Sequence, residues 1–356
     1  MKQWLINPFL LFLQLMKRII MYLLFAAVTI LMAAAFVIWT VALKPNLDID
    51  GTVRIYVPPG SSVDDFIDTV RSVGGLKSEK TFLITSRLKS FSRSLKPGSY
   101  LLEPDMSNNR LVNILRSGQQ TPVRVTFNNI RTLGDLAGRI GGQIAADSAS
   151  LAQFFNDENN YTEDGFTRET LISVFIPDTY EFYWNTDAEG FYTRMLREFR
   201  SYWNDERKAA AEDLGLSPVD VSTLASIIDD EVAKDDEKPR IAGVYLNRLR
   251  LGIPLQACPT IKFALNDFTI RRVLYEHLET DSPYNTYKYR GLPPGPVRCP
   301  TKAGIEAVLK AEKHDYLYFA ARADFSGYHH FSRTLAEHNR YANAYQRELD
   351  KRKIYE

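Results

Sequence analysis

The residues with the clearest chemical potential are three consecutive acids, Asp229, Asp230 and Glu231. They follow a predicted helix start at Ser217 and Pro218, where a serine side chain can cap free N–H groups and proline suits the first turn. The helical period sends three neighbouring side chains in three directions. A carboxyl that points to the apolar side loses hydration, so its pKa rises and it stays protonated near neutral pH. Such a group can act as a general acid in glycosidic cleavage.

Glu231 is the acid that this period places on the apolar side, because it lies three residues after Ile228, four after Ile227 and seven after Leu224, all members of one apolar stripe. Asp230 points away from the stripe and Asp229 lies on its flank, and the helix is expected to continue to about Glu237. Two structural interpretations remain, a core glutamate satisfied by Arg248 or a helix-end carboxylate in an ion pair. The stripe consists of Leu224, Ala225, Ile227, Ile228 and Val232.

A second polar segment, residues 282–287 (SPYNTY), is followed by the proline-rich run 291–296 (GLPPGP). Such a run cannot form a helix or a central strand, so it predicts a stiff loop that offers fixed hydrogen-bond partners to a polar ligand. A connecting loop that is rigid only for packing is the alternative. The five histidines lack metal-ligand spacing, and no glycine-rich phosphate loop occurs, so we expect no metal or cofactor.

The N-terminal segment predicts on which side of a membrane these residues lie. The segment 19–43 holds 25 residues without a charge, enough for a transmembrane helix. Lys17 and Arg18 precede it, which predicts a cytoplasmic N-terminus and an extracytoplasmic remainder. A cleaved signal peptide is the alternative, although the apolar run continues past its candidate site. The 44 basic and 43 acidic residues nearly cancel, which argues against a nucleic-acid partner.

After the predicted membrane helix, residues 53–57 alternate like a strand and residues 98–102 form a second predicted strand. Helical spacing begins near Val63 and Asn108. They predict a small α+β module that serves either as a spacer or as a glycan-binding unit. Residues 120–215 are mostly helical in pattern, with an aromatic-rich stretch at 175–184 that fits a sugar-binding wall or a buried strand equally well. The predicted fold class is α+β.

Three long segments resemble the YceG-like (MltG-type) endolytic murein transglycosylases. They read LASIIDDEVAKDDEKPRIAGVYLNRLRLGIPLQACPTIKFAL, SPYNTYKYRGLPPGPVRCP and YLYFAARADFSGYHHFSRTLAEHN, and occur in this order. The family motif A-S-I-[VI]-E-x-E has its catalytic glutamate as the second acid, which falls on Glu231. Its first acid falls on Asp229, one methylene shorter here. The resemblance implies a cytoplasmic N-terminus (1–18), a transmembrane helix (19–43), a LysM-like module (44–118) and a catalytic domain (119–356).

The resemblance also implies a mechanism. Glu231 would protonate the oxygen between N-acetylmuramic acid and N-acetylglucosamine, then accept the proton of the muramyl C6 hydroxyl as that oxygen attacks C1. The product is a 1,6-anhydro end, and one carboxyl suffices where ordinary glycosidases need two. The resemblance further implies an enzyme of the inner membrane that acts on nascent glycan strands beside synthases of the penicillin-binding protein type. Family positions implied to line the cleft are Asn247, Arg248, Gln256, Thr260, Tyr284, Asn285, Thr286, Tyr287 and His329.

Both cysteines depart from the family pattern. Cys258 replaces the acid of L-Q-x-D-P-T, and Cys299 replaces a polar residue before Pro300. Both stand beside prolines in segments expected to flank one cleft, in an oxidising compartment, so we predict a disulfide between them. Two unrelated buried thiols are the alternative.

Two other functions compete with lyase-type cleavage. A non-catalytic glycan-binding anchor would scaffold cell-wall synthesis, and a hydrolase would use Asp229 or Asp230 as a second carboxylate. The intact acid on the apolar face disfavours the scaffold, and the directions of the two aspartates disfavour the hydrolase. The chemistry of the released ends separates all three.

Overall fold

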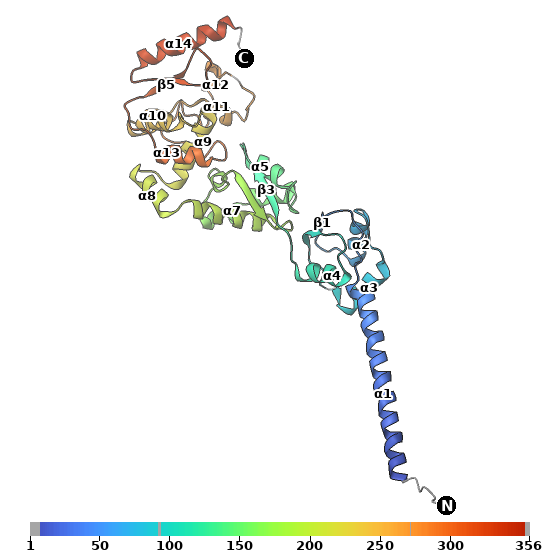
Figure 1. The fold of residues 1–356 in the computed structure, drawn as a ribbon. Helices are drawn as coiled ribbons and strands as arrows, with labels where there is room; N and C mark the ends of the chain where they lie inside the picture. The colour runs from blue at the N-terminus through green and yellow to red at the C-terminus, as the bar shows by residue number, and fades with distance from the viewer. Residues whose placement is uncertain (1–7, 92–93, 271, 353–356) are drawn as a thin grey trace, which may run out of the picture. The chain divides into compact units, whose positions relative to one another are not determined.

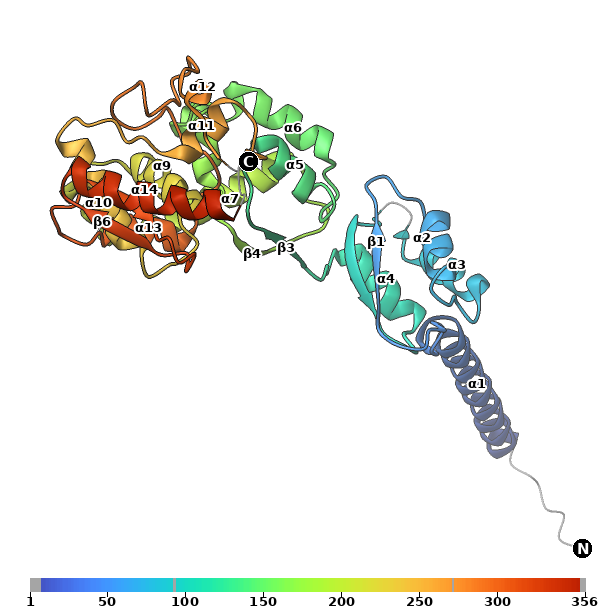
Figure 2. The same cartoon turned by 90° about the horizontal axis from the view of Figure 1, so that it is seen from above.

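The computed structural model describes residues 8–91, 94–270 and 272–352. It divides into two compact units, the first comprising residues 1–123 with 183–185 and the second comprising 124–182 with 186–356. Figures 1 and 2 show mixed helices and short strands in both units, which confirms the mixed character of the predicted fold. Each unit is described by itself.

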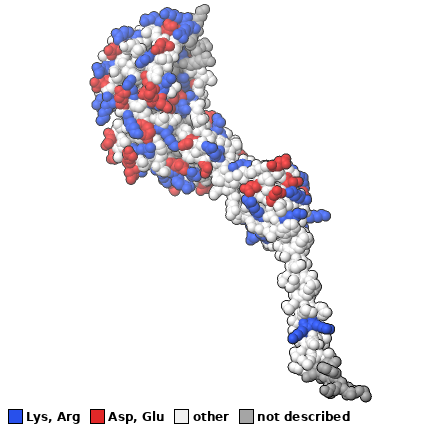
Figure 3. Space-filling model, viewed as in Figure 1, with Lys and Arg blue, Asp and Glu red and all other residues white. Residues whose placement is uncertain are grey.

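The first unit begins with a long apolar helix, α1 (Pro8–Ile38), which continues as a π-helical turn, η1 (Trp39–Leu43). The 35 residues from Phe9 to Leu43 are long and apolar enough to cross a membrane. The predicted span 19–43 lies inside this helix, which starts earlier because residues 9–16 are apolar as well. Lys17 and Arg18 are its only charged residues in the part described, and its surface is otherwise uncharged in Figure 3.

The globular part of the first unit is an antiparallel strand pair covered by three short helices (Figure 2). The two strands that the sequence predicts pair with each other, from Val53 opposite Leu102 to Val57 opposite Gly98. Rings of Phe66, Phe82 and Phe91 contact one another at the centre of its core. Its elements are β1 (Val53–Val57), α2 (Val63–Arg71), α3 (Glu79–Leu88), β2 (Gly98–Leu102) and α4 (Asn108–Ser117).

The second unit opens with a two-stranded sheet, β3 with β4, surrounded by helices. Within the aromatic-rich stretch, Phe175, Tyr180 and Phe182 are buried, and Phe175 stacks on Phe191, so these three form core and not a sugar-binding wall. The elements are β3 (Val123–Phe127), α5 (Leu133–Ile140), α6 (Ser148–Asn156), η3 (Glu158–Asn160), η4 (Thr162–Asp164), η5 (Leu171–Val174), β4 (Asp178–Phe182), α7 (Ala188–Tyr202) and α8 (Asp205–Asp213).

The centre of the second unit is α9, which packs against α8, α10, α11, α13 and η5. Every residue from Val221 to Ile228 is buried, so this helix has no solvent-facing side along that stretch. A hairpin of β5 and β6 follows, with α14 packed on it (Figure 1). The remaining elements are α9 (Pro218–Glu231), α10 (Lys238–Arg250), α11 (Cys258–Ala264), α12 (Tyr275–Leu278), α13 (Lys302–Leu309), β5 (Tyr318–Ala321), β6 (His329–Ser332) and α14 (Leu335–Lys351).

Candidate active site

Helix α9 starts where the sequence predicts and ends earlier than predicted. Ser217 and Asp220 form a reciprocal capping box around Pro218 at the first turn. The helix ends at Glu231, because Val232 adopts an extended backbone that returns its apolar side chain to the core. The expected continuation to Glu237 is therefore wrong, and Glu231 lies at a helix C-terminus. The partial negative charge of a helix C-terminus disfavours an ionised carboxyl there.

The first acid of the three, Asp229, is completely engaged. Its side chain is buried, with 2% exposed, and accepts Lys238 Nζ at 2.8 Å. It also accepts the Thr301 backbone N–H at 2.7 Å and the Thr301 hydroxyl at 2.8 Å. Thr301 is the N-cap of α13, so Asp229 fixes the start of that helix against the end of α9.

The second acid, Asp230, is paired with two arginines. Arg131 approaches its two oxygens at 2.6 and 2.8 Å in a bidentate arrangement, and Arg298 Nη1 lies at 3.2 Å. The amphipathic pattern predicts that only Glu231 faces the apolar side. In the structure the side chains of Asp229 and Asp230 are buried as well, because other helices pack around α9. Neither aspartate is free to serve as a second catalytic carboxylate.

The third acid, Glu231, has no hydrogen-bonding or ion-pairing partner among the residues that the structure describes. Burial raises the pKa of its carboxyl to about 7, the charge of Asp230 acts in the same direction, and Lys262 opposes both. The residue still keeps partial solvent contact. A half-protonated, unpaired carboxyl near the surface is what proton transfer at neutral pH requires. Arg248 does not satisfy it, because that guanidinium binds the carbonyls of other residues.

Three further side chains lie within electrostatic reach of Glu231. Its charge contributes to raising the pKa values of Tyr245, Cys258 and Tyr287, after burial as the main cause. The Tyr245 hydroxyl is buried and has no hydrogen-bond partner in the described part of the chain. Sequence reasoning missed Tyr245 and Lys262. The sequence could have indicated Lys262, because it lies four residues after Cys258 on one helix and therefore on the same face.

Three of the residues predicted to contact substrate are buried and hydrogen-bonded within the protein. Thr260 and Thr286 are buried and share a hydrogen bond of 2.8 Å, and Thr286 O accepts the backbone N–H of Gln256. Asn285 is fully buried, and its side-chain amide donates to Leu278 O at the end of α12 and to Thr280 O. These contacts fix Tyr287, Cys258 and the exposed Gln256, whose backbone has a φ of 54°.

Arg248 and Asn247 hold the chain around β5 through hydrogen bonds to its backbone. Arg248 donates to the carbonyls of Pro254, Leu255 and Leu317 and stacks over the Tyr318 ring. Asn247 donates to two backbone carbonyls, those of residues 314 and 316.

His329 also has an internal partner. Its Nδ1 lies 2.8 Å from Glu237 Oε2, and its backbone N–H donates to the other oxygen of the same carboxylate. This pair connects β6 to the start of α10. Among the described residues, no group of three His, Cys, Asp or Glu side chains is arranged to hold a metal.

The predicted disulfide is wrong, because both cysteines are free thiols in the structure. Cys258 begins α11, and its sulfur lies 3.3 Å from the Tyr287 hydroxyl. Cys299 is fully buried, and its backbone N–H donates to Ile130 O on the segment after β3. Each thiol thus has its own neighbours, and proximity to proline does not supply the Cβ geometry that a disulfide requires.

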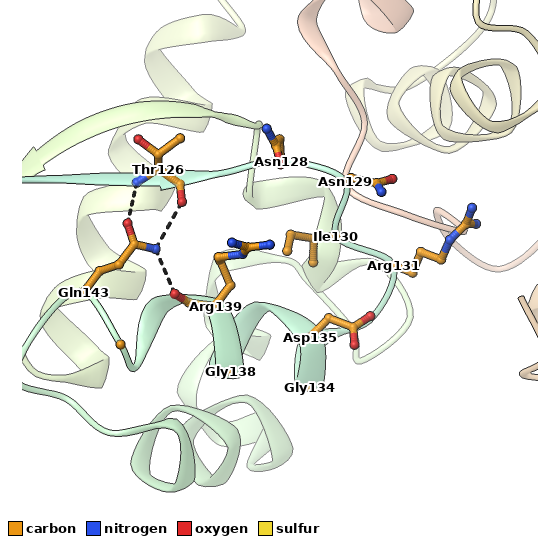
Figure 4. Close-up of a pocket in the computed structure, with 11 residues that line it drawn as sticks. Thr126, Asn128, Asn129, Ile130, Arg131, Gly134, Asp135, Gly138, Arg139 and Gln143 are labelled. Carbon is orange, nitrogen blue, oxygen red and sulfur yellow. Dashed lines mark hydrogen bonds between the residues drawn. The ribbon is translucent and has the colours of Figure 1, made fainter.

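Two hollows adjoin Arg131, the partner of Asp230. A cavity of about 340 Å³ includes Phe263 and the predicted residue Tyr284, whose rings lie 4.6 Å apart. A groove of about 1040 Å³, which we call the β3–α5 groove, lies between the end of β3 and helix α5 (Figure 4). Both hollows can extend a binding site beyond the acid at the end of α9.

The chain is similar to known proteins over most of its length. Residues 55–344 match the model of the YceG-like family. The chain is 31% identical over 333 residues to the endolytic murein transglycosylase of Bacillus subtilis, covering 89% of this chain and 91% of that one.

A longer relative, the endolytic murein transglycosylase of Streptococcus pneumoniae strain D39, is 29% identical over 350 residues, or 85% of this chain and 60% of the relative. The crystal structure of a YceG-like protein from Listeria monocytogenes aligns with a TM-score of 0.55 at 28% identity, covering 82% of this chain and 98% of that one. The chain belongs to the YceG-like family.

Proposed function

We propose that this chain is an endolytic peptidoglycan lytic transglycosylase with Glu231 as its only catalytic acid and base. The observation that carries the proposal is the contrast among three consecutive acids. Asp229 and Asp230 are neutralised by cations, whereas Glu231 is unpaired with its pKa raised to about 7. Relatives named endolytic murein transglycosylases supply the reaction class.

The proposed reaction needs one carboxyl that works twice. Glu231 first gives its proton to the glycosidic oxygen as the bond from muramyl C1 to that oxygen breaks. The muramyl C6 hydroxyl then attacks C1, and its proton returns to Glu231 as the new C1–O6 bond forms. The enzyme is regenerated without water, and the product carries a 1,6-anhydro end. A pKa of about 7 favours both steps, because the carboxyl must donate and accept at one pH.

The apolar helix supports a membrane-anchored enzyme. We propose that the segment 19–43 spans the inner membrane, with residues 1–18 cytoplasmic, because Lys17 and Arg18 precede the uncharged run. The LysM-like module (44–118) and the catalytic domain (119–356) are then periplasmic, where glycan strands lie. Anchoring restricts the enzyme to strands near the membrane, which favours nascent strands and the neighbourhood of peptidoglycan synthases.

The test is the chemistry of the cut ends. Full-length protein in detergent is incubated with purified glycan strands, and the released muropeptides are identified by mass spectrometry. We expect 1,6-anhydro ends from the wild type and from Glu212→Gln, an exposed control on α8. Glu231→Gln should give none. Reducing ends would show hydrolysis. Binding of strands without cleavage by any of the three proteins would support the scaffold function instead.

A further inference from the structure

The β3–α5 groove has a chemistry that the proposed reaction does not use. We propose that it binds the peptide stem that each muramyl residue carries, an inference that rests on the proposed function. The groove lies next to the acid site, because Arg131 lines the groove and also holds Asp230, the residue before Glu231. A muramyl unit at Glu231 would bring its peptide to this neighbourhood.

The polar groups of the groove suit a peptide that carries carboxylates. Arg139 projects from α5 into the space below β3 (Figure 4), and no residue in the described part of the chain pairs with its guanidinium. The only acid in the lining, Asp135, accepts the Thr132 N–H in the capping box of α5. Asp135 uses its Oδ2 for this cap and forms no ion pair with Arg139, so the guanidinium is available for a ligand carboxylate.

The backbone of β3 that faces the groove is paired with a side-chain amide. The Gln143 side chain takes the Thr126 N–H at 2.8 Å and donates to the Thr126 carbonyl at 3.1 Å, which is the pairing that a peptide group would make (Figure 4). The opposite edge of β3 pairs with β4. Asn128, which directly follows the last residue of β3, also lines the groove. An extended peptide that binds along this edge would therefore replace the Gln143 amide at Thr126.

The groove does not suit a sugar ring, because none of its described lining residues is aromatic. The smaller cavity, which Arg131 also lines and which contains Phe263 and Tyr284, has the rings on which a pyranose could stack. Three lining residues at four-residue spacing, Gly134, Gly138 and Gly142, carry no side chain, which explains the hollow. This division assigns the peptide to the β3–α5 groove and the glycan to the smaller cavity.

Two variants test the groove. Arg139→Gln removes the free cation, and Gly138→Gln fills open space, because no atom lies within 4 Å of a Cβ built there. Matched controls are Arg347→Gln, another exposed arginine, and Gly51→Gln, which also has open space around it. The substrates are peptide-bearing glycan strands and the same strands stripped of peptides by an amidase. Full-length protein and the yield of 1,6-anhydro ends are used throughout.

We expect both groove variants to cleave peptide-bearing strands about fivefold more slowly, the size of a charge-assisted hydrogen bond at an exposed site. Their rates on stripped strands should equal the wild-type rate, and the controls should match the wild type on both substrates. Unchanged rates on peptide-bearing strands would overturn the proposal. Equal losses on both substrates would also overturn it, and would indicate that the groove holds glycan.

A binding measurement separates this proposal from the proposed function. Muramyl pentapeptide contains no bond for the enzyme to cut, so its affinity for the full chain can be measured by calorimetry even if the wild type cleaves no strand. Weaker binding by Arg139→Gln than by Arg347→Gln would support the groove whatever the activity. Equal binding by the two variants would refute it.

Discussion

The charges around Glu231 make its pKa adjustable in both directions. Asp230→Asn removes a like charge and leaves Arg131 and Arg298 without their anion, so it should lower the pKa of Glu231. Lys262→Gln removes the one opposing charge and should raise that pKa. Because the two changes are of similar size and lie beside the same carboxyl, each serves as the control for the other.

The magnitude follows from the partial cancellation of Asp230 by its two arginines. An unscreened neighbour would shift the pKa by more than a unit, whereas a carboxylate held by two guanidinium groups should contribute roughly 0.7 unit, or about 1 kcal/mol. Starting from about 7, the variant carboxyl would titrate below neutrality. At pH 8 the protonated fraction, and with it the first step, should fall about fivefold relative to the wild type.

The assay is the initial rate of 1,6-anhydro end formation at low substrate concentration, measured from pH 5 to pH 9. The alkaline limb of this profile reports the acid of the free enzyme. Since Glu231 must be protonated to begin, activity should decline as the pH rises through its pKa. The limb should move to lower pH in Asp230→Asn and to higher pH in Lys262→Gln. Shifts in the same direction, or a wild-type profile that is flat near neutrality, would refute the assignment of Glu231 as the acid.

Three further outcomes are expected. Glu231→Gln should raise the free energy of unfolding above pH 7 by about 1–2 kcal/mol, which is measured as a higher thermal midpoint. The reason is that a carboxyl whose pKa is raised on folding destabilises the folded protein as the pH rises from the unfolded pKa of 4.5 through about 7. Equal midpoints at pH 8 would contradict this. Gly304→Ala should cost about 2 kcal/mol in chemical denaturation, because its Cβ would lie 2.6 Å from the fixed Asp229 carboxylate, whereas Gly138→Ala meets no atom within 4 Å and should be neutral or stabilising. Reductant should change neither activity nor thermal midpoint, because both cysteines are free thiols; a mobility shift on reduction in a denaturing gel would contradict this.

The position of the acid could be predicted from the sequence, because it depends on local spacing. Ser217 and Pro218 set the start of α9, and the helical period then places Glu231 on the side of Ile227 and Ile228. The unpaired state of Glu231 could not be predicted. It depends on the partners of its neighbours, and Arg131 lies 99 residues before Asp230 in the sequence. A local sequence pattern cannot predict a pairing between residues so far apart in the chain.

The predicted cleft residues show a similar limit. A stiff polar loop was expected from the proline-rich run after residue 290, but the pattern does not say which polar groups face a ligand. The structure uses Asn285 and Thr286 inside the loop and leaves Gln256 exposed. The disulfide prediction failed for the same reason, because residue type and compartment do not supply the relative directions of two side chains.

Three adjacent carboxyls in a buried region cannot all ionise without partners, because each would carry a large desolvation cost. The fold resolves this by different means at each position. Asp229 is held by Lys238 and the start of α13. Asp230 is held by Arg131 and Arg298, which lie in loops before and after α9 in the sequence. Glu231 receives no partner, and its pKa rises until the neutral form is populated at pH 7. The two paired acids thus hold the surrounding elements together, and their cations pair with them and not with Glu231. An arginine or lysine placed against Glu231 would stabilise the carboxylate, lower its pKa and remove the proton that the first step needs.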